Sequence, residues 1–112
     1  MRIAFVGTGS MGSALLEGVQ ASTDAQIVAT CASAASATRL HERLGIDTLA
    51  VETTSDANLQ AIRGAQFVFV GVKPWMLAQT LKEIAPYLEP QAVVISMAAG
   101  FSLADMVKHV PN

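Results

Sequence analysis

Six residues near the start of the chain, Gly7-Thr8-Gly9-Ser10-Met11-Gly12, carry glycines at the spacing of a phosphate-binding turn. An apolar run over residues 3–6 leads into them and a helical pattern follows, so the turn joins a strand to a helix. In this setting Gly7 makes a tight turn, Gly9 lets the backbone approach a pyrophosphate, and Gly12 lets the helix pack closely on the strand. The anion would lie at the helix N-terminus, where free N–H groups and the helix dipole favour negative charge. This context predicts a dinucleotide-binding turn rather than a strand-helix turn without a ligand.

The end of the second predicted strand bears on which dinucleotide is bound. An NAD site usually has Asp or Glu there, about twenty residues after the glycine turn, to accept from the ribose 2′-hydroxyl. Residues 30–33 read Thr-Cys-Ala-Ser without a carboxylate, which modestly favours NADP and leaves NAD possible. The hydroxyls of Thr30, Ser33 and Ser36 are candidates to hold a 2′-phosphate. Arg39 is the nearest cation but lies well into the helix, so a phosphate contact and a solvated surface role both stay open for it.

The sequence contains no arrangement for nucleophilic or metal catalysis. Cys31 is the only cysteine, which excludes an internal disulfide, and we interpret it as a small buried residue with no evident cation to lower its pKa. The two histidines, His41 and His109, form no cluster with metal-ligand spacing. Seven basic residues are scattered along a chain of net charge −2, so nucleic acid is not an expected partner.

Apolar runs alternate with helical patterns along the 112 residues. Strands are expected over residues 3–6, 27–30, 48–51, 67–72 and 92–96, and helices over residues 10–21, 34–44, 57–62 after a cap at Asp56, and 74–84. The runs at 67–70 and 92–95 do not alternate with polar residues, which is typical of central parallel strands covered on both faces. Right-handed crossovers then predict an α/β fold, a Rossmann-type doubly wound parallel sheet with strand order 3-2-1-4-5. Its ligand would lie at the carboxyl ends of strands one and four.

Composition limits the size and the location of this protein. With 52% hydrophobic and 14% charged residues, the chain is expected to form one domain with a real core, although it is short for a complete two-substrate enzyme. Its apolar runs are too short to cross a bilayer, and no secretory signal opens it. We therefore expect a cytoplasmic protein without a membrane partner.

Four segments together resemble the N-terminal half of pyrroline-5-carboxylate reductase. They are MRIAFVGTGSMGSALLEG at the start, VGVKPWML at 70–77, VVISMAAGFSLADM at 93–106 and Val-Pro-Asn at 110–112. The glycine turn is shared by many dehydrogenases, whereas the Lys-Pro and the later Ser-x-Ala-Ala-Gly are more specific. The resemblance covers nearly the whole chain. It implies NAD(P)H-dependent reduction of a small imine, 1-pyrroline-5-carboxylate, to proline, with this chain as the cofactor-binding part.

The resemblance also implies which residues bind the cofactor. The turn from Gly7 to Met11 would wrap the pyrophosphate, and Asn58 would lie near the adenosine ribose. The loop beside the nicotinamide ribose would consist of Val72, Lys73 and Pro74, and the nicotinamide would be lined by Met97, Ala98, Ala99 and Gly100. Without the resemblance, Lys73 could also be an ordinary surface lysine. The small residues Ala98, Ala99 and Gly100 could form a tight turn at the end of the fifth strand. No catalytic side chain or metal is expected, because the imine must only be held against the nicotinamide C4.

Three features depart from the family's pattern. Cys31-Ala32 stands where members often have Asn-Arg, which removes the arginine for a 2′-phosphate. Gln66 replaces an Asp before the fourth strand, and Trp75 replaces Gln or His after Lys-Pro; we interpret this tryptophan as a packing or interface aromatic. The chain stops at the Pro-Asn with which the family passes into a helical domain that makes the dimer and holds most of the substrate pocket. We expect that domain to be absent from this chain and the parent protein to be a homo-oligomer.

Two alternative functions stay open. The chain could be the cofactor domain of another NADP-dependent oxidoreductase, such as a deazaflavin-dependent reductase or a hydroxy-acid dehydrogenase. It could also be a nucleotide-binding module without catalysis.

Overall fold

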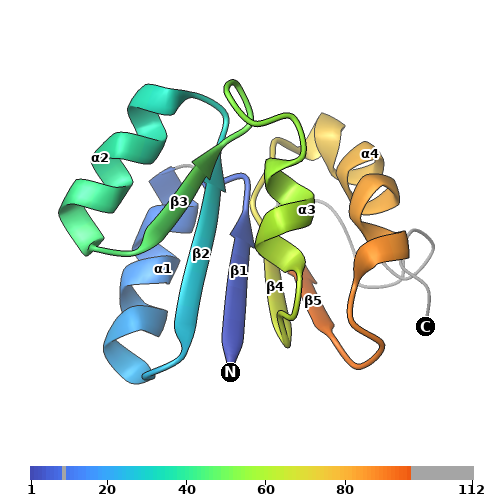
Figure 1. Cartoon of the computed structure of the whole chain (residues 1–112), viewed down its shortest axis with the longest axis horizontal. Coiled ribbons are helices and arrows are strands. Elements are labelled where there is room, and N and C mark those ends of the chain that lie inside the picture. Colours follow the sequence, from blue (N-terminus) through green and yellow to red (C-terminus); the bar gives the residue numbers. More distant parts are fainter. Residues whose placement is uncertain (9, 97–112) are drawn as a thin grey trace.

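The computed structural model describes residues 1–8 and 10–96, in which strands and helices alternate (Figure 1). The strands are β1 (Arg2–Val6), β2 (Gln26–Cys31), β3 (Asp47–Ala50), β4 (Phe67–Val70) and β5 (Val93–Ser96). The helices are α1 (Ser10–Ser22), α2 (Ala34–Leu44), α3 (Ala57–Ile62) and α4 (Pro74–Ile84), followed by a 3-10 turn, η1 (Ala85–Tyr87). Every predicted strand and helix is present in this range, with ends that shift by at most two residues.

The five strands form one parallel sheet in the order β3-β2-β1-β4-β5, which confirms the predicted topology. β1 lies at its centre, and Ile3 pairs with Ile27 on one side and with Phe67 on the other. Because all strands are parallel, their carboxyl ends meet at one edge of the sheet, opposite the N-terminus of the chain (Figure 1). After β3 the chain crosses back over the sheet to add β4 on the other side of β1, so the crevice where such folds bind ligands lies at the carboxyl ends of β1 and β4.

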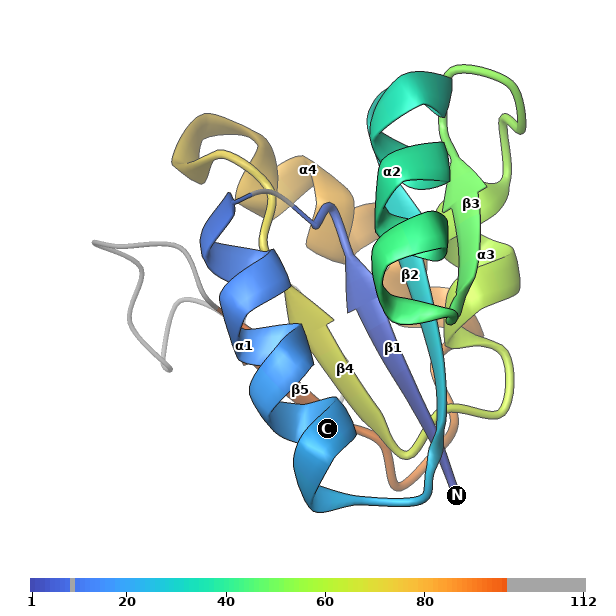
Figure 2. The same ribbon diagram turned by 90° about the vertical axis from the view of Figure 1, so that its left-hand side faces the viewer.

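Each face of the sheet has its own apolar core. Helices α1 and α2 cover one face, and α3 and α4 cover the other (Figure 2). On the first face Phe5 stacks on Phe69 with ring centroids 4.7 Å apart. On the second, Val6 and Val70 pack with Leu77 of α4, all fully buried. Burial on both faces explains why β1 reads as an unbroken apolar run.

β5 departs from the expectation of a central strand. Within the described part of the chain it is the outer strand beside β4, and Val93 is 48% exposed. β4 is central, as predicted. An unbroken apolar run therefore did not distinguish an inner strand from this outer one.

Local sequence signals set the helix ends. Ser33 precedes α2 in an extended conformation, and its side chain accepts from the N–H of Ser36. Gly45 ends that helix with a φ of 70°. Asp56 stands before α3, but the prediction that it caps the helix is wrong for its side chain, which accepts from Nε2 of Gln60 at 2.8 Å instead. Its backbone is not extended, so the carboxylate makes no bond to the first helical N–H groups.

In residues 1–8 and 10–96 no helix has the length and apolar character needed to span a bilayer.

Candidate functional site

Gly7 ends β1 in a conformation that suits glycine. Its φ is +73°, and a Cβ there would collide with Cγ1 of Val72 in the loop after β4. Both constraints confirm that Gly7 makes a tight turn, and they bring the loops after β1 and β4 into contact. Gly9 lies outside the described residues, and the packing around Gly12 in α1 is likewise not described.

Thr30, at the end of β2, holds the start of this turn. The N–H of Gly7 donates to Oγ1 of Thr30 at 2.9 Å, and the N–H of Thr8 donates to the Thr30 carbonyl at 2.8 Å. Thr30 is fully buried, and its hydroxyl donates to Oδ1 of Asn58 at 2.7 Å. The expectation that this hydroxyl could hold an anion is therefore wrong. Backbone donors for a pyrophosphate must come from later residues of the turn, where α1 begins at Ser10.

A cavity of about 470 Å3 lies where the carboxyl ends of β1, β2 and β4 meet. Five of the predicted cofactor residues line it, namely Gly7, Thr8, Asn58, Val72 and Lys73. The remaining lining residues are Cys31, Ala32, Val51, Glu52, Gly71, Met76, Gln79, Thr80 and Glu83. The structure thus gathers loops after three central strands around one hollow.

The lining residues of α4 were missed by sequence reasoning, although their spacing carries a signal. Met76, Gln79, Thr80 and Glu83 follow the i, i+3, i+4, i+7 pattern of one helix face. Glu52 does not lie on this helix but follows the edge strand β3. Its N–H donates to the Ala32 carbonyl, which holds Glu52 beside the end of β2, where it lines the cavity. Two carboxylates and one ammonium, that of Lys73, therefore line the hollow.

The N-terminus of α2 holds a small polar group beside this cavity but outside its lining. Ser33 and Ser36 are joined through their hydroxyls at 3.0 Å, and Arg39 donates from Nη2 to Oγ of Ser36 at 3.2 Å. Helical side chains lean toward the N-terminus, so the guanidinium reaches back one turn from its own position. The cation therefore lies closer to the helix start than its sequence position indicates.

Cys31 is 2% exposed, which confirms the interpretation as a small buried residue. Burial raises the pKa of its thiol, and the positive charge of Arg39 partly offsets that rise. The expectation that no cation acts on the thiol is wrong, because Arg39 reaches toward the end of β2. With burial as the larger effect, the thiol is neutral at neutral pH.

The remaining predicted residues have mixed outcomes. Lys73 is exposed and stands directly before α4, and Pro74 occupies the first turn of that helix. Trp75 is 78% exposed, so it packs against little of the described chain, and an interface role or a stacking role against the cofactor stays open. Gln66 has a structural role, since its Oε1 accepts from the N–H of Arg2 at 2.8 Å. Met97, Ala98, Ala99 and Gly100 lie outside the described residues.

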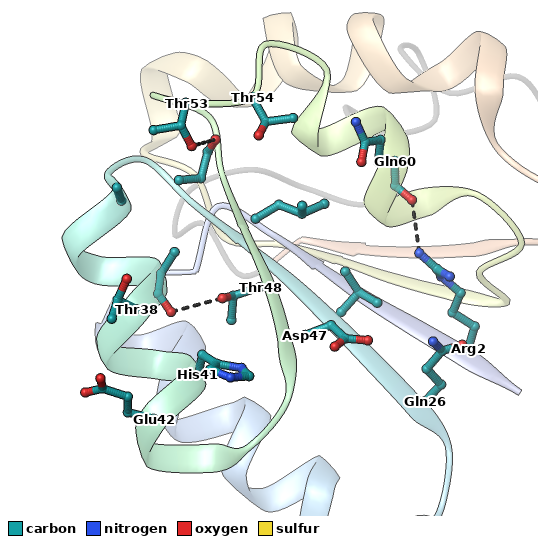
Figure 3. Close-up of a pocket in the computed structure, with 15 residues that line it drawn as sticks. Arg2, Gln26, Thr38, His41, Glu42, Asp47, Thr48, Thr53, Thr54 and Gln60 are labelled. Carbon is teal, nitrogen blue, oxygen red and sulfur yellow. Dashed lines mark hydrogen bonds between the residues drawn. The ribbon is translucent and has the colours of Figure 1, made fainter.

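A second and larger cavity, of about 650 Å3, follows the outer edge of β3 (Figure 3). Several of its polar side chains are bonded to backbone carbonyls. Arg2 donates to the carbonyl of Gln60 at 3.0 Å, and Thr48 donates to that of Ala37 at 3.0 Å. Figure 3 shows Thr48 pointing toward α2 and Arg2 pointing toward Gln60 of α3. Among the described residues no group of three His, Cys, Asp or Glu side chains is placed to hold a metal ion, here or elsewhere.

The profile of the family described as NADP oxidoreductase, coenzyme F420-dependent, matches residues 2–100. The chain belongs to this family. Among curated proteins, pyrroline-5-carboxylate reductase of Pseudomonas aeruginosa is 31% identical over 107 residues, covering 94% of this chain. Pyrroline-5-carboxylate reductase 3 of Danio rerio is 27% identical, covering 99% of it. These matches confirm the resemblance stated from the sequence.

Solved structures agree with this membership of the NADP oxidoreductase family. A pyrroline-5-carboxylate reductase from Coxiella burnetii superposes with a TM-score of 0.84 at 26% identity, covering 98% of this chain and 40% of that one. Prephenate dehydrogenase from Aquifex aeolicus superposes with a TM-score of 0.83 at 15% identity, which shows the shared fold alone. The chain spans 37% of the length of each of the two curated relatives.

Proposed function

We propose that this chain is the NAD(P)-binding domain of an enzyme that reduces 1-pyrroline-5-carboxylate to proline. The observation that carries the proposal is the cavity at the carboxyl ends of β1, β2 and β4, because the glycine turn and the Val72 loop both line it and contact each other there. The curated relatives support the choice of substrate, because they are named for this reductase.

In this proposal the turn from Gly7 to Met11 holds the pyrophosphate, and Gly12 brings α1 close to β1. Asn58 lies at the adenosine ribose, and Ser33 lies on the side of its 2′ position. The Val72-Lys73-Pro74 loop holds the nicotinamide ribose, and residues 97–100 hold the nicotinamide. The cavity suits this occupant because Gly7 and Val72 both line it and approach each other so closely that a Cβ at Gly7 would collide with Val72.

The bound cofactor supplies the hydride, and the chain's own residues position it. An imine carbon is already electrophilic, so the proposed reaction needs no nucleophilic side chain. Binding and orientation then account for the rate, since holding donor and acceptor about 3 to 3.5 Å apart supplies a large part of the barrier reduction.

We propose NADP as the preferred cofactor, with NAD also accepted. Arg39 and the hydroxyls of Ser33 and Ser36 place one cation and two donors at the start of α2. Glu52 opposes them, because its N–H is bonded to the Ala32 carbonyl at the end of β2 and its negative charge disfavours a phosphate nearby. The opposition of Arg39 and Glu52 makes the expected preference modest.

The substrate pocket and the oligomer interface belong in this proposal to a helical domain outside this chain, so the 112 residues form one part of a two-domain, homo-oligomeric enzyme. The exposed Trp75 and Met76, beside the cavity, are suited to an interface with that part. We place the enzyme in the cytoplasm, in keeping with a single buried thiol and no internal disulfide.

A second candidate is favoured by the family's description, which names coenzyme F420-dependent NADP oxidoreductases. The cavity would bind NADP in the same way, and the hydride would pass to or from F420 instead of an imine. Turnover by the chain joined to the remainder of its protein separates the two, with pyrroline-5-carboxylate and F420 offered in parallel.

Calorimetric titration of the 112-residue chain with NADPH tests the binding proposal. We expect weak binding and a raised melting temperature, since a ligand that binds only the folded state stabilises it. We also expect no measurable reduction of pyrroline-5-carboxylate by this chain alone, followed as NADPH absorbance. Absence of heat and of thermal stabilisation at millimolar cofactor would contradict the site, and robust turnover would contradict the two-domain proposal.

A further inference from the structure

A continuous line of hydrogen bonds runs beneath the cavity at the carboxyl ends of β1, β2 and β4. It passes from the N–H of Gly7 to Oγ1 of Thr30 (2.9 Å), from that hydroxyl to Oδ1 of Asn58 (2.7 Å), and from Nδ2 of Asn58 to Oε1 of Glu83 (3.2 Å). The four residues come from the glycine turn, β2, α3 and α4. The line therefore joins four elements that surround the hollow.

The direction of each bond is fixed by chemistry. The N–H of Gly7 can only donate, so Oγ1 of Thr30 accepts there and its own proton goes to Asn58. The Glu83 carboxylate can only accept, so the nitrogen of the Asn58 amide must face it. A flipped amide would place Oδ1 against the carboxylate oxygen, which is repulsive. The buried Thr30 hydroxyl and Glu83 thus select the same amide orientation.

This orientation determines what Asn58 offers to a ligand. Its oxygen is engaged by Thr30, and one proton of Nδ2 is engaged by Glu83, so the second proton of Nδ2 has no protein partner among the described residues. The carboxylate of Glu83 is exposed and keeps further accepting capacity. Asn58 and Glu83 both line the cavity, where they present one donor beside one acceptor.

A donor beside an acceptor matches hydroxyl groups, which accept and donate in turn, and the carboxylate disfavours a phosphate at the same place. We infer that Thr30 is a positioning residue that fixes the Asn58 amide, so that Asn58 and Glu83 together bind the free hydroxyls of the adenosine ribose, which are the 3′-hydroxyl in NADP and both hydroxyls in NAD. This inference rests on the proposed function and adds Thr30 and Glu83 to it. Thr30 acts through Asn58 and does not itself touch the ligand.

The test compares ADP with 2′,3′-dideoxy-ADP, titrated into the chain by calorimetry. The unsubstituted chain is expected to bind ADP about three- to tenfold more tightly, the value of one or two hydrogen bonds. Thr30→Val keeps the shape of the side chain and removes both of its bonds, so the two ligands should bind with nearly equal affinity. Thr30→Ser restores the hydroxyl and should restore the preference.

Thr48→Val is the matched control, because the Thr48 hydroxyl bonds to the backbone of α2 outside this cavity. It should lower stability while retaining the preference for ADP. Should Thr30→Val not fold, Asn58→Ala is expected to lose the preference as well.

An unchanged ADP preference in folded Thr30→Val, or in Asn58→Ala, would overturn the inference while leaving the cofactor proposal intact. If the unsubstituted chain binds neither ADP nor NADPH, the proposed function fails, and this inference fails with it.

Discussion

The cavity along β3 and the cavity at the strand ends differ in the elements that line them, which their volumes do not show. The larger one, about 650 Å3, lies along the outer edge of β3, and the smaller one, about 470 Å3, lies at the carboxyl ends of β1, β2 and β4. In the larger cavity, polar side chains such as Thr48 are bonded to nearby backbone carbonyls. In the smaller, a glycine turn, two loops and one face of α4 converge. We therefore expect the ligand where the strand ends converge, and not in the larger hollow.

The largest expected effect comes from a substitution at Gly7, in the wall of the smaller cavity. Gly7→Ala introduces a side chain at a φ of +73° and against Val72, so it should destabilise the fold by roughly 2 to 4 kcal/mol and abolish cofactor binding. Urea unfolding and NADPH titration measure the two effects. Gly45→Ala is the matched control, because Gly45 has a φ of +70° and a Cβ there would meet no other atom within 4 Å. It should cost only about 1 to 2 kcal/mol and leave binding unchanged. Equal effects of the two substitutions would contradict the role given to the turn.

A second substitution in the wall of the smaller cavity tests which dinucleotide this cavity prefers. Ala32→Arg adds a bidentate partner for a 2′-phosphate, beside Arg39 and opposite Glu52, and should raise the preference for NADP over NAD about ten- to a hundredfold. Ala32→Gln, which adds length without charge, controls for bulk. An unchanged ratio of the two affinities would show that the end of β2 does not face the 2′ position.

The smallest expected effect is a pH dependence at Cys31, in the same wall. Burial raises the pKa of its thiol above the ordinary 9.0, so the folded chain holds the proton more tightly than the unfolded chain does. The resulting stability is complete below pH 9 and is lost as the pH rises above it, with a slope of at most about 1.4 kcal/mol per pH unit. Urea unfolding from pH 8 to pH 10 should show a shallower alkaline loss for Cys31→Ala than for the unsubstituted chain. Identical slopes would show that the thiol titrates alike in both states.

The sheet could be predicted from the sequence because its signals are local. Apolar runs mark the strands, the Gly7 turn marks the first crossover, and Ser33 and Gly45 mark the ends of α2. Handedness rules then leave few strand orders, and the observed order is the one predicted. That order already places β5 at the edge of the sheet, and the expectation that failed is that its apolar run is covered on both faces, since Val93 is 48% exposed.

Sequence motifs predicted only those parts of the candidate site whose residues belong to the motif itself. The glycine turn and the Val72-Lys73 loop were found in this way. Thr30 was misread as an anion ligand, because only the folded chain brings Gly7 and Asn58 onto its hydroxyl. Glu83 lies on a face of α4 whose helical spacing is visible in the sequence, but only the folded chain shows that this face lines the cavity. Glu52 follows β3 and reaches the cavity through tertiary packing, which no spacing in the sequence records.

The most direct measurement is an NMR titration of the isotope-labelled chain with NADPH, which reads both cavities at once through the backbone amides. We expect the shifts to concentrate around the smaller cavity, at Gly7, Thr8, Ala32, Asn58 and Lys73. The amides of Thr38, His41 and Thr53, in the wall of the larger cavity, should stay unchanged. Shifts concentrated along β3 and α2 at the larger cavity, with the Gly7 turn silent, would contradict the claim that the converging strand ends bind the cofactor.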